Sequence, residues 1–298
     1  MRGALAIGWA TILLTISVAL AMTSVMQTIA AESGPAGSEQ GGLRRQEWLI
    51  PSPGKGVPMH AILFRPAGDG PFPLAIINHG SSEDARERKR QKLAEFPYLS
   101  AWLVARGYAV LLPQRPGHGA TGGSYLEAQG WCRSPDYIRA GEGTAQSILA
   151  AYKYMHEQEF IAAERTIIVG NSAGGWGALA FAGEAPDGVA GVVNFVGGRG
   201  GRDQNRADNN CAPDKLVEAA GVFGAAAKVP TLWLYAENDT FFGPELSQRI
   251  AAAFVAAGGD AEYHLLPAVR GDGHALMSTA GEEATWAPYL KKFLSRLP

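Results

Sequence analysis

The sequence contains few of the residues that mark several broad classes of protein. It has two cysteines among 298 residues, too few for a fold held together mainly by disulfides. Charged residues make up 18% of the chain and the formal net charge is -2, so there is no basic surplus for binding a polyanion. The densest basic run, residues 86–92, follows Glu83 and Asp84. This mixed pattern predicts a solvated helix face, and we expect no nucleic-acid partner.

The N-terminal part of the chain lacks charge between Arg2 and Glu32. A long apolar stretch after a basic residue, followed by small residues, predicts a signal peptide over 1–31 and export to the periplasm or the medium. The apolar run is also long enough for a retained anchor, and only that alternative would make a membrane a partner. No cysteine lies near this segment, which excludes lipid attachment through an N-terminal cysteine. Residues 32–44 are rich in glycine and serine and predict a flexible linker.

From residue 45 to residue 298, strand-like apolar runs alternate with helix-like stretches, without internal repeats. The predicted strands are 47–51, 60–66, 73–80, 108–113, 165–170, 189–198, 230–239 and 261–267, and the predicted helices are 86–107, 136–158, 175–185, 244–259 and 285–297. Strands buried on both faces are apolar without alternation, so the pattern predicts an α/β domain with a mainly parallel sheet and helices on both faces. The long connections 114–135 and 197–228 follow strands and should lie at the carboxyl edge of the sheet, where ligands bind.

A glycine-rich stretch, GNSAGGWG at 170–177, directly follows the apolar run RTIIV. It does not fit a phosphate-binding loop, because Trp176 stands where that loop needs lysine and the glycine spacing for dinucleotides is missing. The first five residues fit the pattern G-x-S-x-G between a strand and a helix, where a sharp turn holds a serine hydroxyl clear of the sheet. Ser172 is the predicted nucleophile, and the N–H of Ala173 is a predicted oxyanion donor.

A serine nucleophile needs a base and an acid, and after this turn they follow in the order acid, then histidine. His274, in a glycine-flanked loop before the last predicted helix, is the predicted base. Asp239, at the end of the predicted strand 230–239, is the predicted acid, with Glu237 as the alternative.

The loop NHGSS at 78–82 should supply the second oxyanion donor, the N–H of Ser81, with Gly80 as the alternative. His79 in this loop is expected to be a structural hydrogen-bonding residue. Side chains in or next to the predicted site loops are candidate substrate contacts, with ordinary core packing as the alternative for the aromatic ones: Trp131, Trp176, His118, Phe241 and Phe242.

The motifs NHG, GNSAGGWG, YAENDTFFGP and DGHALM, in this order, resemble those of serine hydrolases of the α/β-hydrolase superfamily. The resemblance covers about 45–298, and it is nearest to the dienelactone-hydrolase-like branch, with some likeness to prolyl-oligopeptidase catalytic domains. It implies an α/β-hydrolase fold and cofactor-free hydrolysis of a small-molecule carboxylic ester by a Ser-His-Asp triad. Dienelactone hydrolases use a cysteine nucleophile, so Ser172 makes a serine esterase mechanism the expectation. The alternatives are a serine peptidase of prolyl-oligopeptidase type and a catalytically silent binding protein.

The two cysteines, Cys132 and Cys211, lie one in each of the two long connections. Both connections should meet at the same edge of the sheet, and in an oxidising compartment nearby thiols pair, so we predict a disulfide, with separate thiols as the alternative. The Asp and Asn residues of 197–210 lack the spacing of a calcium loop, and no metal site is expected. The same connection holds arginines that either recognise an anionic group or are solvated: Arg199, Arg202 and Arg206.

Overall fold

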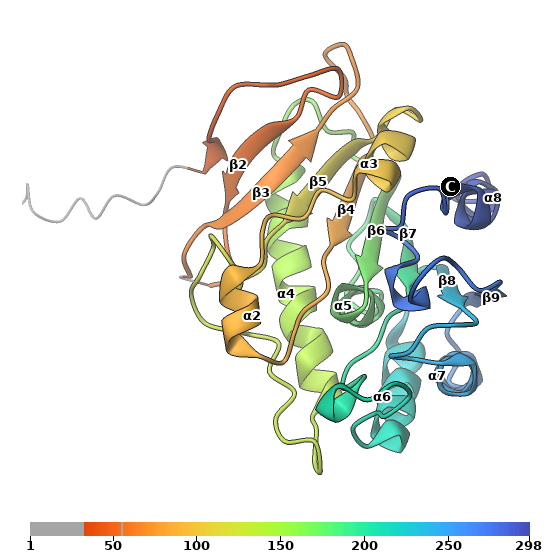
Figure 1. The fold of residues 1–298 in the computed structure, drawn as a ribbon. Coiled ribbons are helices and arrows are strands. Elements are labelled where there is room, and N and C mark those ends of the chain that lie inside the picture. Colours follow the sequence, from red (N-terminus) through yellow and green to blue (C-terminus); the bar gives the residue numbers. More distant parts are fainter. Residues whose placement is uncertain (1–32, 55) are drawn as a thin grey trace, which may run out of the picture. The chain divides into compact units, whose positions relative to one another are not determined.

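The computed structural model describes residues 33–298 with the exception of residue 55, and the predicted signal peptide over 1–31 lies outside the described residues. The centre of the described part is a nine-stranded sheet with the strand order β1-β2-β3-β5-β4-β6-β7-β8-β9 (Figure 1). Strands β1 to β3 pair antiparallel, as do β3 and β5, and every pair from β5 to β9 is parallel. The prediction of a mainly parallel sheet is therefore confirmed. The strand bounds are β1 Gly34–Pro35, β2 Gln46–Ile50, β3 Met59–Phe64, β4 Leu74–Asn78, β5 Ala109–Pro113, β6 Thr166–Asn171, β7 Val189–Phe195, β8 Thr231–Ala236 and β9 Ala261–Leu266.

Helices cover both faces of this sheet, as predicted. They are α2 Ala85–Arg90, α3 Pro97–Val104, α4 Tyr137–Met155, α5 Ala173–Phe181, α6 Pro213–Ala226, α7 Pro244–Ala256 and α8 Glu283–Leu294, with short 3-10 turns η1 Asp203–Asn205 and η2 Gly273–Ala275. Helices α4 to α7 pack against one another in one layer. Helices α3 and α8 contact each other outside this layer, and the rings of Trp102 and Trp286 lie 5.8 Å apart there. None of the helices in the described part is both long and apolar enough to span a bilayer.

Strand β7 shows why these strands read as continuous apolar runs. Every residue of β7 is buried, because successive side chains point to opposite faces and both faces are covered. Asn194 lies against Gly175 of α5, whereas the ring of Phe195 lies 5.9 Å from the ring of Trp286 in α8. The helix layers containing α5 and α8 are therefore on opposite faces of the sheet.

Three segments differ from the sequence predictions. The helix predicted over 86–107 is two helices, because Phe96 takes a left-handed backbone conformation and Pro97 then starts α3. Helix α6 lies within the connection 197–228, which was predicted as a loop. Residues 34 and 35 of the predicted linker 32–44 pair with β2 as the short strand β1, so this part of the segment is hydrogen-bonded to the sheet.

The parallel part of the sheet brings distant loops together. Strands β4, β6, β7, β8 and β9 run in the same direction, so the loops that follow them emerge at one edge. These loops begin near residues 79, 172, 196, 237 and 267. They contain the predicted nucleophile, acid, base and oxyanion loop, and their common edge is where ligands bind in open α/β sheets.

Candidate active site

Ser172 occupies a strained turn between β6 and α5. Its backbone angles are φ 54° and ψ -121°, in a region that residues with a side chain rarely adopt. Its N–H donates to the carbonyl of Phe195 over 3.0 Å, and its own carbonyl accepts from the N–H groups of Trp176 and Gly198 over 2.9 and 3.2 Å. Three backbone hydrogen bonds thus hold the serine in the conformation that a nucleophile turn requires.

Glycines allow this turn to pack closely on the end of β4. A Cβ on Gly170 would overlap the backbone of Gly174, and a Cβ on Gly174 would overlap the carbonyl of Asn78. The loop after β4 therefore lies beside Ser172. A Cβ on Gly80 would be 3.3 Å from the Cβ of Ser172.

His274 and Asp239 form a hydrogen-bonded pair. The Nδ1 atom of His274 lies 3.2 and 3.3 Å from the two carboxylate oxygens of Asp239. Asp239 is 2% exposed, and its Oδ1 also accepts the N–H groups of Phe241 and Phe242 over 2.8 and 3.1 Å. A carboxylate only accepts, so Nδ1 carries the proton and Nε2 keeps its lone pair. The ring of Phe241 stacks on the imidazole at a centroid distance of 4.0 Å and restricts its orientation.

Two polar residues tie the loop carrying the acid to the loop carrying the histidine. The side chain of Asn238 donates to the carbonyl of Val269 over 2.9 Å and accepts the N–H of the same residue over 3.0 Å. The carboxylate of Asp272 accepts from the Thr240 hydroxyl over 2.5 Å and from the N–H of His274 over 2.9 Å. Sequence reasoning missed both residues, although polar side chains beside the predicted acid and base were a usable signal.

The alternative acid, Glu237, makes no hydrogen bond to His274 in the part of the chain that the structure describes. It lines a separate cavity of about 460 Å³, which neither Ser172 nor His274 borders. The geometry therefore favours Asp239 as the partner of the histidine.

Two residues with backbone N–H groups of interest, Ala173 and Ser81, line the same cavity as Ser172. Ala173 is the first residue of α5, where helix N–H groups have no partner within the helix. Within residues 33–298 other than 55, the N–H groups of Ala173 and Ser81 do not donate to any backbone carbonyl. Both residues line a cavity of about 860 Å³ together with Ser172 and His274. The two N–H groups are available to a carbonyl oxygen bound in this cavity.

His79 fixes the peptide between Gly80 and Ser81. Its Nε2 accepts the N–H of Arg115 over 3.1 Å, so its Nδ1 carries the proton and donates to the carbonyl of Gly80 over 2.7 Å. Gln91 Nε2 lies 2.9 Å from the same Nδ1 and donates to the carbonyl of Gly80 over 3.4 Å. Burial and the nearby Arg115 lower the pKa of His79 well below its usual value, so the ring is neutral. A peptide N–H points opposite to its carbonyl, so this bond orients the Ser81 N–H.

A chain of hydrogen bonds, the Ser81 network, holds the Ser81 side chain. His118 places its Nδ1 3.1 and 3.2 Å from two backbone carbonyls, so its Nε2 accepts the Ser81 hydroxyl over 2.8 Å. Ser81 in turn accepts the Tyr125 hydroxyl over 3.0 Å, and Tyr125 accepts Arg199 Nη2 over 2.8 Å. Burial lowers the pKa of His118 to about 4, which keeps it a neutral acceptor. Each group therefore donates to the next one: Arg199 to Tyr125, Tyr125 to Ser81, and Ser81 to His118.

The predicted substrate contacts divide into two groups. Phe241 and Phe242 line the 860 Å³ cavity. Trp176 is fully buried, since α5 is covered on all sides, and its indole N–H donates to the carbonyl of Tyr137 over 2.8 Å. Trp131 is 86% exposed and does not border the cavity. The prediction of substrate contact is wrong for Trp176, where the alternative of core packing holds, and for His118, which is fully buried behind Ser81. Contact by Trp131 stays a prediction.

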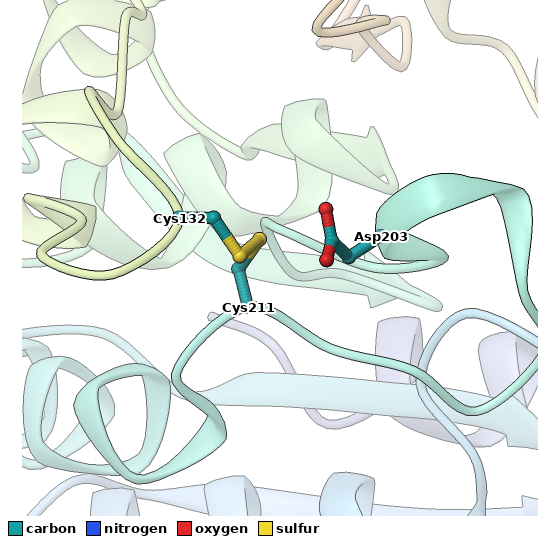
Figure 2. A group of neighbouring side chains, drawn as sticks. All are labelled: Cys132, Asp203 and Cys211. Atoms are coloured by element: carbon teal, nitrogen blue, oxygen red, sulfur yellow. A yellow bond between two sulfur atoms is a disulfide. The ribbon is translucent and has the colours of Figure 1, made fainter.

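Cys132 and Cys211 are joined in a disulfide, with their Cα atoms 4.9 Å apart. Figure 2 shows this bond beside the carboxylate of Asp203. Because the two sulfurs are bonded to each other, neither is a thiolate that could bind a metal ion. Cys211 lines the cavity, and its carbonyl accepts the hydroxyl of Tyr137. The bond therefore ties the two long connections together at the cavity wall.

Comparisons with known proteins match this architecture. A sequence model of the prolyl oligopeptidase family matches residues 94–197, and a comparison with curated proteins gave no match. Among solved structures, one described as a dienelactone hydrolase from Klebsiella pneumoniae subsp. pneumoniae has a TM-score of 0.54 and 19% identity, covering 85% of this chain and 98% of its own. Acetyl xylan esterase from Paenibacillus sp. R4 has a TM-score of 0.62 and 13% identity, covering 100% and 97%.

An acylaminoacyl peptidase from Pyrococcus horikoshii also matches, with a TM-score of 0.62 and 14% identity. The alignment covers 87% of this chain but 42% of the peptidase, so the chain spans about two fifths of that protein's length. At these identities the similarity shows the fold. The chain has the fold that these hydrolases share, and the fold predicted from its motifs is confirmed.

Proposed function

We propose that this α/β-hydrolase is a serine hydrolase that cleaves carboxylic esters through an acyl-enzyme intermediate. The observation that carries the proposal is the meeting of the strained Ser172 turn and the His274–Asp239 pair at one cavity. The order of these three residues along the chain is the order typical of this fold. The two backbone N–H groups beside Ser172 add the electrostatic component that acyl transfer needs.

The first half of the reaction acylates the enzyme. Ser172 Oγ attacks the ester carbonyl carbon, and His274 Nε2 takes the hydroxyl proton. The negative charge that develops on the carbonyl oxygen is stabilised by the N–H groups of Ala173 and Ser81. Asp239 holds the imidazole in the correct tautomer and stabilises its positive charge. Collapse of the intermediate breaks the ester bond, and His274 gives the proton to the leaving alcohol.

The second half releases the acid. Water enters where the alcohol left, and His274 removes a proton as the water oxygen attacks the acyl carbon. The same N–H groups stabilise the second oxyanion, and its collapse returns the proton to Ser172. All acid, base and electrophilic roles are filled by this chain, so the proposed steps require no cofactor.

A serine peptidase is the second candidate, favoured by the family match over 94–197 and by the similarity to acylaminoacyl peptidase. A third alternative, a silent binding protein, is not favoured by the His274–Asp239 pair at the cavity that Ser172 lines. The Cys132–Cys211 bond supports the further proposal that the protein is exported, because disulfides persist in oxidising compartments.

The decisive test compares Ser172→Ala with wild type on short-chain nitrophenyl esters and on fluorophosphonate labelling. Loss of the nucleophile should lower turnover by more than about a thousandfold and abolish labelling, without loss of the fold. Ser295→Ala, at an exposed serine that ends α8, is the matched control and should behave like wild type. Retention of more than about a tenth of the rate by Ser172→Ala would disprove the nucleophile assignment. Faster turnover of amides than of esters would favour the peptidase, and an unlabelled, inactive wild type would favour the binding protein.

A further inference from the structure

Residues 201–210 form a loop, called here the 201–210 loop, whose two ends lie close together. The N–H of Cys211 donates to the carbonyl of Gly200 over 2.8 Å, and Cys211 is bonded to Cys132. The first five residues of the loop line the 860 Å³ cavity. Compact surface loops with close ends are frequently functional, so the contacts between this cavity wall and the candidate triad bear on catalysis.

The 201–210 loop packs on the segment that follows Asp239. The N–H of Asp208 donates to the carbonyl of Thr240 over 2.9 Å, and the side chain of Asn210 donates to the carbonyl of Phe241 over 2.5 Å. Thr240 and Phe241 are the two residues directly after Asp239 in the chain. The loop is therefore hydrogen-bonded to the backbone next to the predicted acid.

Arg202 connects this loop to the hydrogen bonds that hold His274. Its Nη1 donates to the Thr240 hydroxyl over 2.9 Å and lies 3.5 Å from the carboxylate of Asp272. Because this hydroxyl accepts from Arg202, its own hydrogen is free to point to Asp272, which accepts it over 2.5 Å. The same carboxylate accepts the backbone N–H of His274 over 2.9 Å. Three hydrogen bonds in sequence thus lead from Arg202 to the backbone of the predicted base.

The guanidinium of Arg202 also lies over Phe241. Its Cζ is 5.4 Å from the centroid of that ring, which is within the range of a cation–π contact. The ring of Phe241 in turn stacks on the imidazole of His274, with the centroids 4.0 Å apart. Arg202 therefore contacts a group that holds the backbone of His274 and a second group that holds its ring.

The partners of Arg202 give it a role inside the protein. Its Nη2 donates to the carbonyl and to the side-chain oxygen of Asn205, each over 3.2 Å, so both terminal nitrogens are engaged. Burial acts to raise the pKa of Asp272, but the hydrogen bonds from Thr240 and His274 outweigh it, and the pKa lies below its usual value. Asp272 is thus a carboxylate at neutral pH. The side chains of Arg202 and Asp272 are 27% and 32% exposed, so solvent screens the pair and it adds little stability.

We propose that Arg202 is a positioning residue for His274. Acting through Asp272 and Phe241, it holds the imidazole in the orientation in which the ring can serve as the base for Ser172. The proposal rests on the serine hydrolase function given above and adds the residue that couples the cavity wall to the base. From sequence, Arg202 was either an anion-binding or a solvated residue, and its contacts assign it this third role.

The variant Arg202→Met keeps the length of the side chain but removes its charge and its donors, and short-chain nitrophenyl esters are suitable uncharged substrates. A displacement of about 1 Å can cost on the order of a hundredfold, so we expect kcat to fall by roughly ten- to a hundredfold. KM should change by less than about twofold, because the base acts in the transition state. The matched control is Arg206→Met, since Arg206 lies in the same loop but donates to Gln204 over 2.9 Å and does not line the cavity. It should behave like wild type.

Two results of this comparison would overturn the inference. If Arg202→Met raised KM and left kcat unchanged, Arg202 would be a substrate contact. If both constants stayed within about twofold of wild type, it would have no role in the reaction. Arg202→Lys, which keeps a charged donor, should restore part of the lost kcat, and a kcat no higher than that of Arg202→Met would also contradict the proposal.

A double-variant comparison tests the hydrogen-bonded route. Thr240→Val removes the hydroxyl between Arg202 and Asp272, so it should lower kcat by itself. It also keeps the proposal testable if Arg202→Met is unstable in urea unfolding. Combining the two substitutions should cost little more than Arg202→Met alone, because both break the same route. Losses that multiply would show that Arg202 does not act through Thr240.

The hydrogen-bonded Nδ1 proton of His274 gives a readout that needs no turnover. It should give a downfield proton resonance that is identified by its loss in His274→Gln. This proton should exchange with water faster in Arg202→Met than in wild type or Arg206→Met, because the ring is held less firmly. If no ester is hydrolysed, the proposed function fails, and this exchange rate still decides the positioning role. Equal rates in the three proteins would overturn the inference.

Discussion

Replacement of Ser81 by alanine distinguishes the role of its side-chain hydroxyl from the role of its backbone N–H in the proposed oxyanion loop. The backbone N–H at this position is retained, whereas the hydroxyl that holds it in the Ser81 network is lost. That hydroxyl donates to His118 over 2.8 Å and accepts from Tyr125 over 3.0 Å. Any change in catalysis therefore comes from the position of the N–H group and not from its removal.

The expected losses of stability and of kcat follow from these contacts. Ser81→Ala leaves the Nε2 of the fully buried His118 without its donor and the Tyr125 hydroxyl without its acceptor. Each such loss costs about 1–3 kcal/mol of stability. Complete loss of one oxyanion donor costs about a hundred- to a thousandfold in kcat. Because His79 still holds the neighbouring peptide, we expect a smaller effect than that complete loss, about ten- to a hundredfold in kcat. KM should change little, since the donor acts mainly in the transition state.

The assay combines steady-state kinetics, urea unfolding and the affinity of a trifluoromethyl ketone inhibitor that forms an oxyanion. Inhibitor affinity should fall with kcat in Ser81→Ala, and Ser81→Thr, which keeps the hydroxyl, should restore both. Tyr125→Phe removes one of the two contacts and should give an intermediate effect. A Ser81→Ala protein that loses stability but keeps kcat and inhibitor affinity within about twofold would refute the positioning role.

Three further predictions follow from the same geometry. Asp239→Asn should lower kcat by about ten-thousandfold because it disturbs the His274 tautomer, whereas Glu237→Gln should cost little; the reverse ranking would transfer the role to Glu237. The free energy of unfolding should fall as the pH drops from 6.5 to about 4, because the pKa of His118 is about 4 in the fold and 6.5 when exposed, so the unfolded chain binds the proton first; a flat profile in urea titrations would contradict this. Cys132→Ser with Cys211→Ser should remove up to about 4.5 kcal/mol of stability by loop-closure entropy, and calorimetry showing no change would argue against the bond.

The sequence was sufficient for the fold and for the order of the candidate triad because both depend on local patterns. Buried parallel strands show as apolar runs, and the turn at Ser172 shows as its glycine spacing. The Ser81 network could not be read in this way. His118 and Tyr125 are 37 and 44 residues from Ser81, Arg199 is a further 74 residues from Tyr125, and these separations share no period, so only the packed loops bring the residues together.

The error for Trp176 has a related cause. A position in a loop near the site does not specify on which side of the loop a side chain lies. Trp176 follows the turn at Ser172 but lies on a helix that is buried on all sides, whereas Trp131, in the connection 114–135, is exposed. Exposure of this kind is decided by tertiary packing, for which a single sequence carries no direct signal.

Three histidines lie near the candidate site: His79, His118 and His274. Their hydrogen-bond partners explain why only His274 suits the role of base. His79 and His118 each donate from Nδ1 to a backbone carbonyl and use Nε2 to accept a donor of the fold. Burial and the charge of Arg115 lower the pKa of both, so a proton on either ring would be unfavourable and would break an existing hydrogen bond.

His274 has the opposite environment. Its Nδ1 faces the carboxylate of Asp239, which stabilises the imidazolium, and its ring lines the cavity next to Ser172. The same side chain is therefore given a positioning role or a proton-transfer role by whether Nδ1 meets a neutral carbonyl or a carboxylate. This distinction predicts that a neutral side chain in place of Asp239 leaves the His274 imidazolium without its counter-charge and its ring without a fixed tautomer, so His274 becomes a poor base, as the loss of kcat in Asp239→Asn would show.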